Sequence, residues 1–297
     1  MAIYISDPIF TDIEKLREFL ILNECLSSHN NCTKCTGEQK LTIGTINENF
    51  RIFYRCSVKG CQQRTSVLSI NMPPTKYIHL LYLLLSGSTY QQLEWWYGFS
   101  SASIARAKTA VRNLYTRYIN DRPVFIGRIG VVVEVDETVL SRRGVISKPT
   151  SLSDEQRDTV WIVGCIDNTP QKNFFLKRVQ NRTILCLTDT LINNILVGST
   201  VHSDGYRSYP GVCQNIGVQH RVVNHSVGFV AEDGTHTNNI EGFWLHLKSS
   251  MRKENGVARE NIDTWLSEYI FRRRYLMNKS GDEFSAIFIE LLKYLFK

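Results

Sequence analysis

The stretch VVVEVDETVL, at residues 131–140, decides the fold class of this chain. Its β-branched residues predict a strand, and the run of valines predicts that the strand is buried. Side chains alternate between two faces along a strand, so Glu134 and Asp136 should share a face. A buried carboxylate without a partner is costly, which makes Asp136 a candidate functional residue rather than an ordinary surface acid.

Strands and helices alternate on the C-terminal side of this strand. We predict strands at residues 159–166, 174–179, 199–202 and 219–224, and helices at residues 182–196, 239–252 and 262–277. Three strands, a helix, two further strands and then helices predict a mixed α/β layer fold around one hydrophobic core.

The region before residue 123 has a different pattern. A helix is predicted within residues 10–25, short strand-like pieces with four cysteines at 30–66, helical segments at 74–120, and a linker at 121–123. These patterns divide the chain into an N-terminal helix at 1–28, a cysteine-containing module at 29–70, a helical region at 71–122 and an α/β domain at 123–297.

The composition excludes several classes of protein. Of 297 residues, 43% are hydrophobic and 11% aromatic, which is too much for a disordered chain. The longest apolar stretch is half of what a membrane helix needs, and the first residues do not form a secretory signal. The net charge of +7 is weak support for a polyanionic partner.

Four of the eight cysteines form two pairs, Cys32-x-x-Cys35 and Cys56-x4-Cys61. Two short cysteine hairpins can supply the four soft ligands that Zn²⁺ takes in a tetrahedron, so we predict a structural zinc ribbon. The alternative is four reduced structural cysteines without metal. Basic residues around the second pair favour a phosphate-facing surface over a purely structural staple.

Residues 90–114 have the pattern of a helix–turn–helix, with Gly98 at the turn and a serine cap on the second helix. On that helix Arg106, Lys108 and Arg112 should face outward, as in a recognition helix that enters the major groove of DNA. An amphipathic helical hairpin with a solvated basic face explains the pattern equally well.

Two further acids, Asp204 and Glu241, lie at a strand end and a helix start that could converge with Asp136 on one spot. Asp204 directly follows a short strand, and Glu241 lies near the start of a helix, where Asn238 is expected to cap the helix and orient it. Three converging carboxylates would repel one another unless cations lay between them, which suits two Mg²⁺ (or Mn²⁺) ions roughly 4 Å apart, acting on phosphodiesters. Individually, Asp204 could be a turn residue and Glu241 part of a capping box.

Three stretches carry a family resemblance: VEVDETVLSRRG at 133–144, VHSDGYRSYPGV at 201–212 and THTNNIEGFWLHLKSSMRK at 235–253. With YIFRRRY at 269–275 and the cysteine module upstream, they resemble DDE transposases of the Merlin superfamily and their bacterial insertion-sequence, ISXO2-like relatives. The resemblance covers most of the chain, from about Cys32 to Tyr275. The chain differs from the family in its second cysteine pair, whose spacing is wider than the common one.

The resemblance implies a ribonuclease-H-like catalytic core and metal-dependent, cut-and-paste DNA transposition. By matching motifs, the catalytic and metal-binding triad falls on Asp136, Asp204 and Glu241. The implied partners are double-stranded DNA, as terminal inverted repeats and target DNA, and further copies of the chain in a homodimer or larger assembly, with no membrane.

Two other predictions complete this interpretation. Lys248 and Arg252 lie two and three helical turns beyond Glu241, so they share its face of the helix and are expected to contact DNA phosphates.

We expect a nuclear location, with a bacterial cytoplasm as the alternative. The rival functions are a domesticated, non-catalytic zinc-ribbon DNA-binding protein and a junction resolvase of the same fold.

Overall fold

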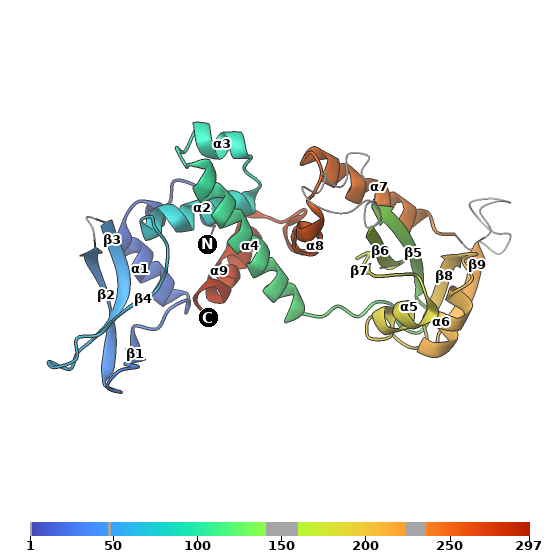
Figure 1. The fold of residues 1–297 in the computed structure, drawn as a ribbon, viewed down its shortest axis with the longest axis horizontal. Coiled ribbons are helices and arrows are strands. Elements are labelled where there is room, and N and C mark those ends of the chain that lie inside the picture. Colours follow the sequence, from blue (N-terminus) through green and yellow to red (C-terminus); the bar gives the residue numbers. More distant parts are fainter. Residues whose placement is uncertain (1, 47–48, 141–159, 224–235) are drawn as a thin grey trace, which may run out of the picture. The chain divides into compact units, whose positions relative to one another are not determined.

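The computed structural model describes residues 2–46, 49–140, 160–223 and 236–297, and the chain divides into two compact units (Figure 1). The terminal unit comprises Met1–Tyr118 and Arg272–Lys297, and the central unit comprises Ile119–Phe271. The sequence-based division assigned the last residues to the α/β domain, whereas their contacts group residues 272–297 with the N-terminal part of the chain.

The terminal unit contains a four-stranded antiparallel sheet in the order β1-β2-β3-β4. Its strands are β1 (His29–Asn31), β2 (Glu38–Ile46), β3 (Asn49–Cys56) and β4 (Arg64–Ser66). A one-turn helix, η1 (Pro8–Phe10), and α1 (Ile13–Leu22) precede the sheet, and the Asp12 side chain caps α1 by accepting from the amides of Glu14 and Lys15.

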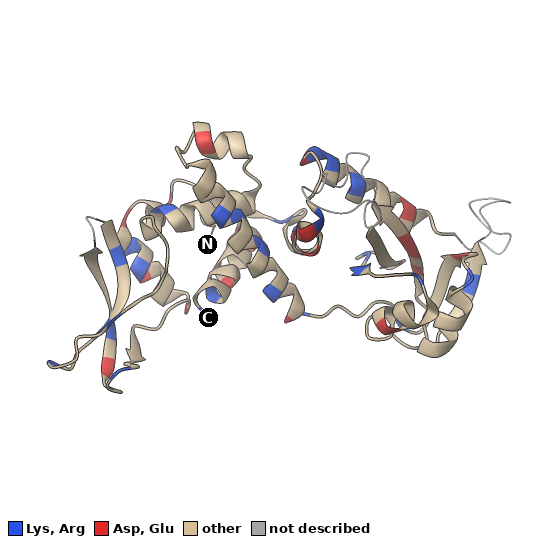
Figure 2. Ribbon diagram, viewed as in Figure 1, with Lys and Arg blue, Asp and Glu red and all other residues tan. Residues whose placement is uncertain are grey.

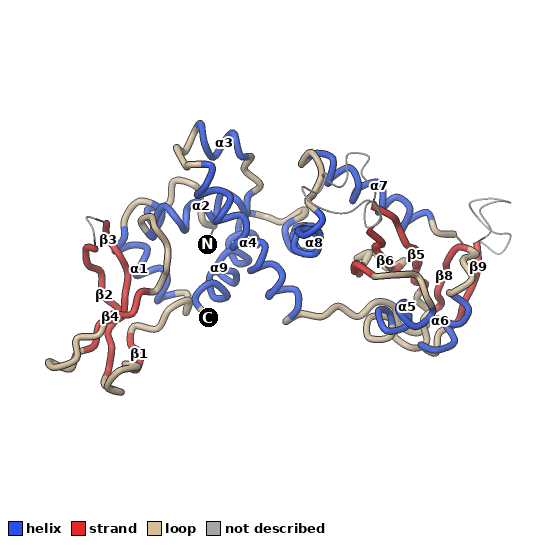
Figure 3. The backbone as a smooth tube through the Cα atoms, viewed as in Figure 1, coloured by secondary structure: helices blue, strands red, loops and turns tan. Residues whose placement is uncertain are grey.

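Helices follow this sheet in the terminal unit (Figure 3): α2 (Pro74–Ser86), α3 (Tyr90–Trp95) and α4 (Ser101–Asn120). The predicted helix–turn–helix pattern is confirmed at the level of these elements. Gly98 has a φ of +65° in the turn, and the Ser100 hydroxyl accepts from the Ser103 amide at the start of α4. Ile104, Val111 and Leu114 are buried, as the periodicity of α4 predicts.

The C-terminal helix α9 (Gly281–Phe296) was not predicted from the sequence. It begins with a capping box between Ser280 and Glu283, and its Phe288 packs against Tyr82 of α2, with ring centroids 5.2 Å apart. A π-helical turn, η4 (Arg272–Leu276), precedes it, and Arg272 donates to the last carbonyls of α2, at Leu84 and Leu85. This arginine therefore has a structural partner in its own unit.

The central unit is built on a five-stranded mixed sheet in the order β7-β6-β5-β8-β9. The strands are β5 (Val132–Leu140), β6 (Val160–Asp167), β7 (Phe174–Val179), β8 (Thr200–Asp204) and β9 (Gln219–Val223). β5, β6 and β7 pair antiparallel, whereas β8 and β9 pair in parallel with their neighbours, starting from β5. The predicted mixed α/β class is thus confirmed.

Helices cover both faces of this sheet (Figures 1 and 3). On one face, α5 (Ile184–Leu191) and α6 (Tyr209–Ile216) share a core with Val133, Val135 and Val163. On the other face, α7 (Asn238–Lys253) and α8 (Ile262–Phe271) pack against Ile162 and Leu176, with the short η3 (Arg259–Asn261) between these two helices in sequence. The sequence missed α6, and α5 begins two residues later than predicted because Thr183 caps it through the Cys186 amide.

Within the described ranges, no helix combines the length and apolarity that crossing a bilayer requires.

Candidate functional site

The register of the central sheet brings Asp136 and Asp204 side by side on the neighbouring strands β5 and β8. β5 and β8 run parallel, with Val133 opposite Val201 and Glu134 opposite His202. Continuing this register by two residues makes Asp136, in the middle of β5, level with Asp204, the last residue of β8. Both side chains are partly exposed and can therefore be reached from outside the fold.

Helix α7 is attached to this part of the sheet by Glu134, a residue to which the sequence gave no role. The Glu134 carboxylate, only 1% exposed, accepts from the backbone amides of Asn239 and Ile240 at 2.8 and 3.0 Å, and also from the Asn239 side chain. A carboxylate suits the free amides and positive dipole end of a helix N-terminus. The predicted cap at Asn238 is wrong, since α7 begins at that residue and Thr237 is in the N-cap position. The Thr237 side chain makes no capping hydrogen bond to the first amides of α7.

The same helix positions Glu241 and Trp244 toward Asp136. Glu241 lies in the first turn of α7, and the Trp244 indole, one turn further on, donates to Asp136 Oδ2 at 2.8 Å. Gly164, directly opposite Asp136 on β6, makes room for this ring, because a Cβ there would lie 2.5 Å from the Trp244 side chain. Trp244 is therefore a buried core residue that also holds a carboxylate.

Burial and neighbouring charges change the acidity of Asp136. The pKa of this carboxyl is raised to about 6, chiefly by desolvation and also by the negative charges of Asp204 and Glu241, while the Trp244 N–H and the Glu137 amide oppose the shift. The three predicted carboxylates thus lie close enough to interact electrostatically.

The carboxylates are nevertheless not drawn into a tight cluster. In the part of the chain that the structure describes, one group of at least three acidic, histidine or cysteine ligand atoms lies within 4.8 Å, and it is the cysteine quartet. Carboxylate oxygens are the ligands that hard divalent cations prefer, so the donor set fits Mg²⁺ or Mn²⁺.

Basic side chains continue along α7 beyond these acids, toward its C-terminal end (Figure 2). Lys248 is partly buried, and desolvation lowers the pKa of its ammonium, as does the charge of Arg252, while the Asp136 carboxylate raises it. Lys248 is therefore near Asp136, and the exposed Arg252 is near Lys248, as the helical spacing predicts.

A second buried acid, Glu137, lies on the opposite face of β5. Its Oε2 accepts from the hydroxyl of Tyr209 on α6 at 2.7 Å. The pKa of the Glu137 carboxyl is raised to about 7, chiefly by desolvation and also by the charge of Asp136. The sequence did not single out this residue, although strand alternation separates it from Asp136.

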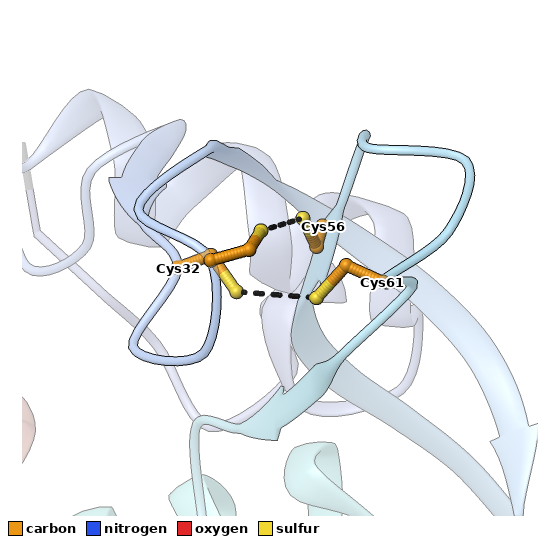
Figure 4. Close-up of side chains that lie close together, drawn as sticks. Cys32, Cys56 and Cys61 are labelled. Carbon is orange, nitrogen blue, oxygen red and sulfur yellow. Dashed lines mark hydrogen bonds between the residues drawn. The ribbon is translucent and has the colours of Figure 1, made fainter.

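The four predicted zinc ligands meet in the terminal unit (Figure 4). The sulfur of Cys32 lies 3.7 Å from that of Cys61, and the sulfur of Cys35 lies 3.5 Å from that of Cys56. A tetrahedron with Zn–S bonds of about 2.3 Å has S–S edges of about 3.8 Å, so the thiols fit Zn²⁺. Burial raises the pKa of the Cys32 thiol, but the hydrogen bonds from the amides of Lys34 and Cys35 and from the side chains of Cys61 and Cys35 together lower the pKa to about 7, which favours a thiolate ligand.

The predicted DNA-binding residues of α4 differ in exposure. Arg106 is exposed, whereas Lys108 and Arg112 are partly buried, and the Lys108 ammonium lies 5.8 Å from the centroid of the Tyr90 ring. Several basic residues lie along this helix (Figure 2).

Comparison with known proteins identifies the family. The ISXO2-like transposase domain matches residues 129–274, which include Asp136, Asp204 and Glu241. A curated relative from Haemophilus influenzae, named a transposase-like protein, is 33% identical over 94 residues, which are 32% of this chain and 72% of the relative. The chain belongs to the ISXO2-like transposase family.

A search of solved structures returned the Drosophila P element transposase strand transfer complex. The match has 13% sequence identity and covers 76% of this chain and 65% of that one. Its TM-score of 0.27 is too low to support any argument about this transposase.

Proposed function

We propose that this transposase cleaves DNA at the ends of a mobile element and joins the 3′-hydroxyls to target DNA, with Asp136, Asp204 and Glu241 as its catalytic, metal-binding triad. The observation that carries the proposal is the convergence of these acids, two from parallel strands in register and one from the helix that Glu134 and Trp244 attach to the sheet. Residues far apart in the sequence are thereby gathered at one edge.

Each residue near the triad has a role in this proposal. The carboxylates hold two Mg²⁺ (or Mn²⁺) ions, which when bound lower the pKa of the attacking hydroxyl and stabilise the leaving oxygen. Trp244 fixes the orientation of Asp136, and Glu134 fixes the start of α7 and with it Glu241. Lys248 and Arg252 bind phosphates of the DNA strand beside them.

A ribonuclease-H-like fold for the central unit is part of the proposal. The sheet order β7-β6-β5-β8-β9, with helices on both faces and acids on the central strand and its parallel neighbour, supports it. Residues 123–297 remain the proposed catalytic domain, with its C-terminal helix contributing to the terminal unit.

The terminal unit is proposed to bind the terminal inverted repeats of the element. Its support is a thiol quartet that fits structural Zn²⁺ and a basic helix α4, with Arg106, Lys108 and Arg112 as the DNA-contacting residues. Because two ends must be held together, we propose a homodimer or larger assembly on the DNA. The relative from Haemophilus influenzae favours the bacterial cytoplasm over the nucleus as its location.

The test is a strand-transfer assay with Mg²⁺, full-length protein and a plasmid that carries the inverted repeats found beside the gene. Asp136→Asn, Asp204→Asn and Glu241→Gln should each reduce strand transfer at least a thousandfold, since the triad acts as a unit. DNA binding should be unchanged. Asp189→Asn, an exposed acid on α5, is the matched control and should retain full activity.

Other outcomes separate the alternatives. Full activity in any of the three triad variants would contradict the mechanism. A wild-type protein that binds the repeats but never nicks them would be a non-catalytic, domesticated DNA-binding protein, and cleavage without joined products would indicate a resolvase-like nuclease.

A further inference from the structure

Arg182 stands at the same edge of the central sheet as the triad, although its position in the sequence gives no hint of this. β5 and β6 are antiparallel, so the C-terminal end of β5 lies beside the start of β6, where Trp161 pairs with Val139. Trp161 also pairs with Val179, the last residue of β7. The chain leaves β7 at this edge and reaches Arg182 three residues later.

Two contacts attach Arg182 to the loop that follows Asp204. The hydroxyl of Ser208 donates to the Arg182 carbonyl at 2.8 Å, and the guanidinium carbon lies 4.0 Å from the centroid of the Tyr206 ring. Tyr206 in turn donates its backbone amide to Asp204 Oδ1 at 3.0 Å. Arg182 is thus coupled to a proposed metal ligand through one short turn.

The guanidinium is also held by a second aromatic ring. Its central carbon lies 4.1 Å from the centroid of the Trp161 ring. Stacking on aromatic rings uses the flat faces of a guanidinium and leaves the N–H donors in its plane available. A side chain held in this way loses little further conformational freedom when it binds a ligand.

The in-plane donors of Arg182 have no partner among the residues that the structure describes. No hydrogen bond or ion pair joins the guanidinium to them, and the nearby Glu137 uses its Oε2 for Tyr209 instead. The side chain is partly exposed. A rigid, accessible guanidinium with free donors matches the oxygens of a phosphate.

We propose that Arg182 binds a phosphate of the DNA strand next to the scissile bond, with its guanidinium donating to the non-bridging oxygens. This inference rests on the proposed function, because it assigns the substrate backbone to the same edge as the triad. Arg182 approaches from the α5 and α6 face of the sheet, whereas Lys248 approaches from the α7 face. The two cations would therefore hold the strand from both sides of the acids.

The experiment is a double-mutant cycle between the protein and the DNA. Full-length wild type and Arg182→Gln are titrated with inverted-repeat duplexes in which single phosphates near the cleavage position are replaced by neutral methylphosphonates, with Ca²⁺ in place of Mg²⁺ to prevent cleavage. Arg182→Gln should bind the unmodified duplex about tenfold more weakly, as expected for one lost charge-assisted hydrogen bond. At one phosphate position, the methylphosphonate should weaken wild type similarly and leave Arg182→Gln unaffected.

Arg178→Gln is the matched control, because it removes the same charge from the end of β7. Arg178 already pairs with Asp263 at 3.3 Å, so its variant should show independent effects at every phosphate. Arg182→Lys, which keeps the charge but loses the planar fork, should retain part of the coupling.

Independent effects of Arg182→Gln and of every methylphosphonate, in a protein with unchanged thermal unfolding, would overturn the proposal and leave Arg182 a structural residue. Coupling equal to that of Arg178→Gln would do the same. Failure of the proposed function is a separate result, seen as wild-type protein that does not cleave with Mg²⁺, whatever the binding cycle shows.

Discussion

The cysteine quartet and the carboxylate triad are both predicted metal sites, but the chain assembles them in opposite ways. The cysteines come from two hairpins within one small sheet, and their sulfurs are already at tetrahedral distances. The carboxylates come from two strands and a helix separated by long stretches of chain, and they interact by charge without closing into a tight cluster.

The difference shows what each site requires from the rest of the protein. Soft thiol ligands on short hairpins need only local turns, and the metal itself stabilises such a module. A site of hard carboxylates must be held together against their mutual repulsion by a folded sheet, and here Glu134, Trp244 and Gly164 contribute to this. Folding should therefore require metal in the first case, whereas in the second the packing alone supports the fold and a bound metal only adds to its stability.

The largest expected effect is the loss of zinc from the quartet. Cys56→Ser should lose the metal, and the terminal unit should lose its cooperative unfolding transition, because binding of structural zinc contributes on the order of 10 kcal/mol to folding. Zinc content by mass spectrometry and circular dichroism melting check this. Cys186→Ser, at a partly exposed cysteine on α5, is the control and should keep one zinc per chain. An unchanged zinc content in Cys56→Ser would disprove the site.

Removal of the Glu134 carboxylate should give the next largest effect. Glu134→Ala leaves two α7 amides without an acceptor, at a cost of about 3 kcal/mol in the free energy of unfolding. Chemical denaturation measures this cost. Glu134→Gln, whose amide oxygen can still accept, should lose clearly less. Equal losses for the two variants would mean that packing, and not the hydrogen bonds, anchors the helix.

The raised pKa of Asp136 predicts that stability depends on pH and on Mg²⁺. The folded-state pKa of about 6 exceeds the unfolded value of 3.8, so the folded protein binds this proton more tightly. Its contribution to stability is present below about pH 4 and disappears as the pH rises through 6, a loss of about 3 kcal/mol.

Bound Mg²⁺ should offset this loss, because it stabilises the ionised carboxylate. We expect Mg²⁺ to raise the melting temperature at about pH 8 and to have little effect at about pH 5. Asp136→Asn should lose the dependence on Mg²⁺ and the part of the pH dependence that comes from this carboxyl, while the part that comes from Glu137, whose pKa is raised to about 7, should remain. Thermal unfolding over a pH series provides the measurement, and a Mg²⁺ effect that persists in Asp136→Asn would place the ion elsewhere.

The smallest expected effect concerns the packing beneath Trp244. Gly164→Ala introduces a Cβ that overlaps the indole, which should cost about 1–3 kcal/mol and displace the ring from Asp136. Gly242→Ala, in α7 with open space at its Cβ, should instead stabilise the helix slightly. Urea denaturation and Mg²⁺ titration of both variants test the comparison. A Gly164→Ala protein with unchanged Mg²⁺ affinity would show that the indole does not position Asp136.

The sequence predicted the strands of the central sheet well because their patterns are local. The strand expected at residues 174–179 coincides with β7, and the valine run became β5 within one residue. Helix α9 was missed although the capping box of Ser280 and Glu283 is a local signal for its start, whereas its packing against α2 is a property of the tertiary structure. Helix α6 was missed because it has only eight residues, although Pro210 suits the first turn of a helix.

The residues of the candidate site also fall into two groups, those that local sequence patterns predict and those that only tertiary contacts reveal. The sequence determined the cysteine quartet, the three acids and the basic positions on α7, because spacing and strand alternation are properties of the chain itself. Only the tertiary structure decided that Glu134 anchors a helix, that Trp244 reaches Asp136 over a glycine, and that Arg182 stacks beside the Asp204 loop. These contacts join strands and helices that are distant in sequence, and no local pattern encodes which of them will become neighbours.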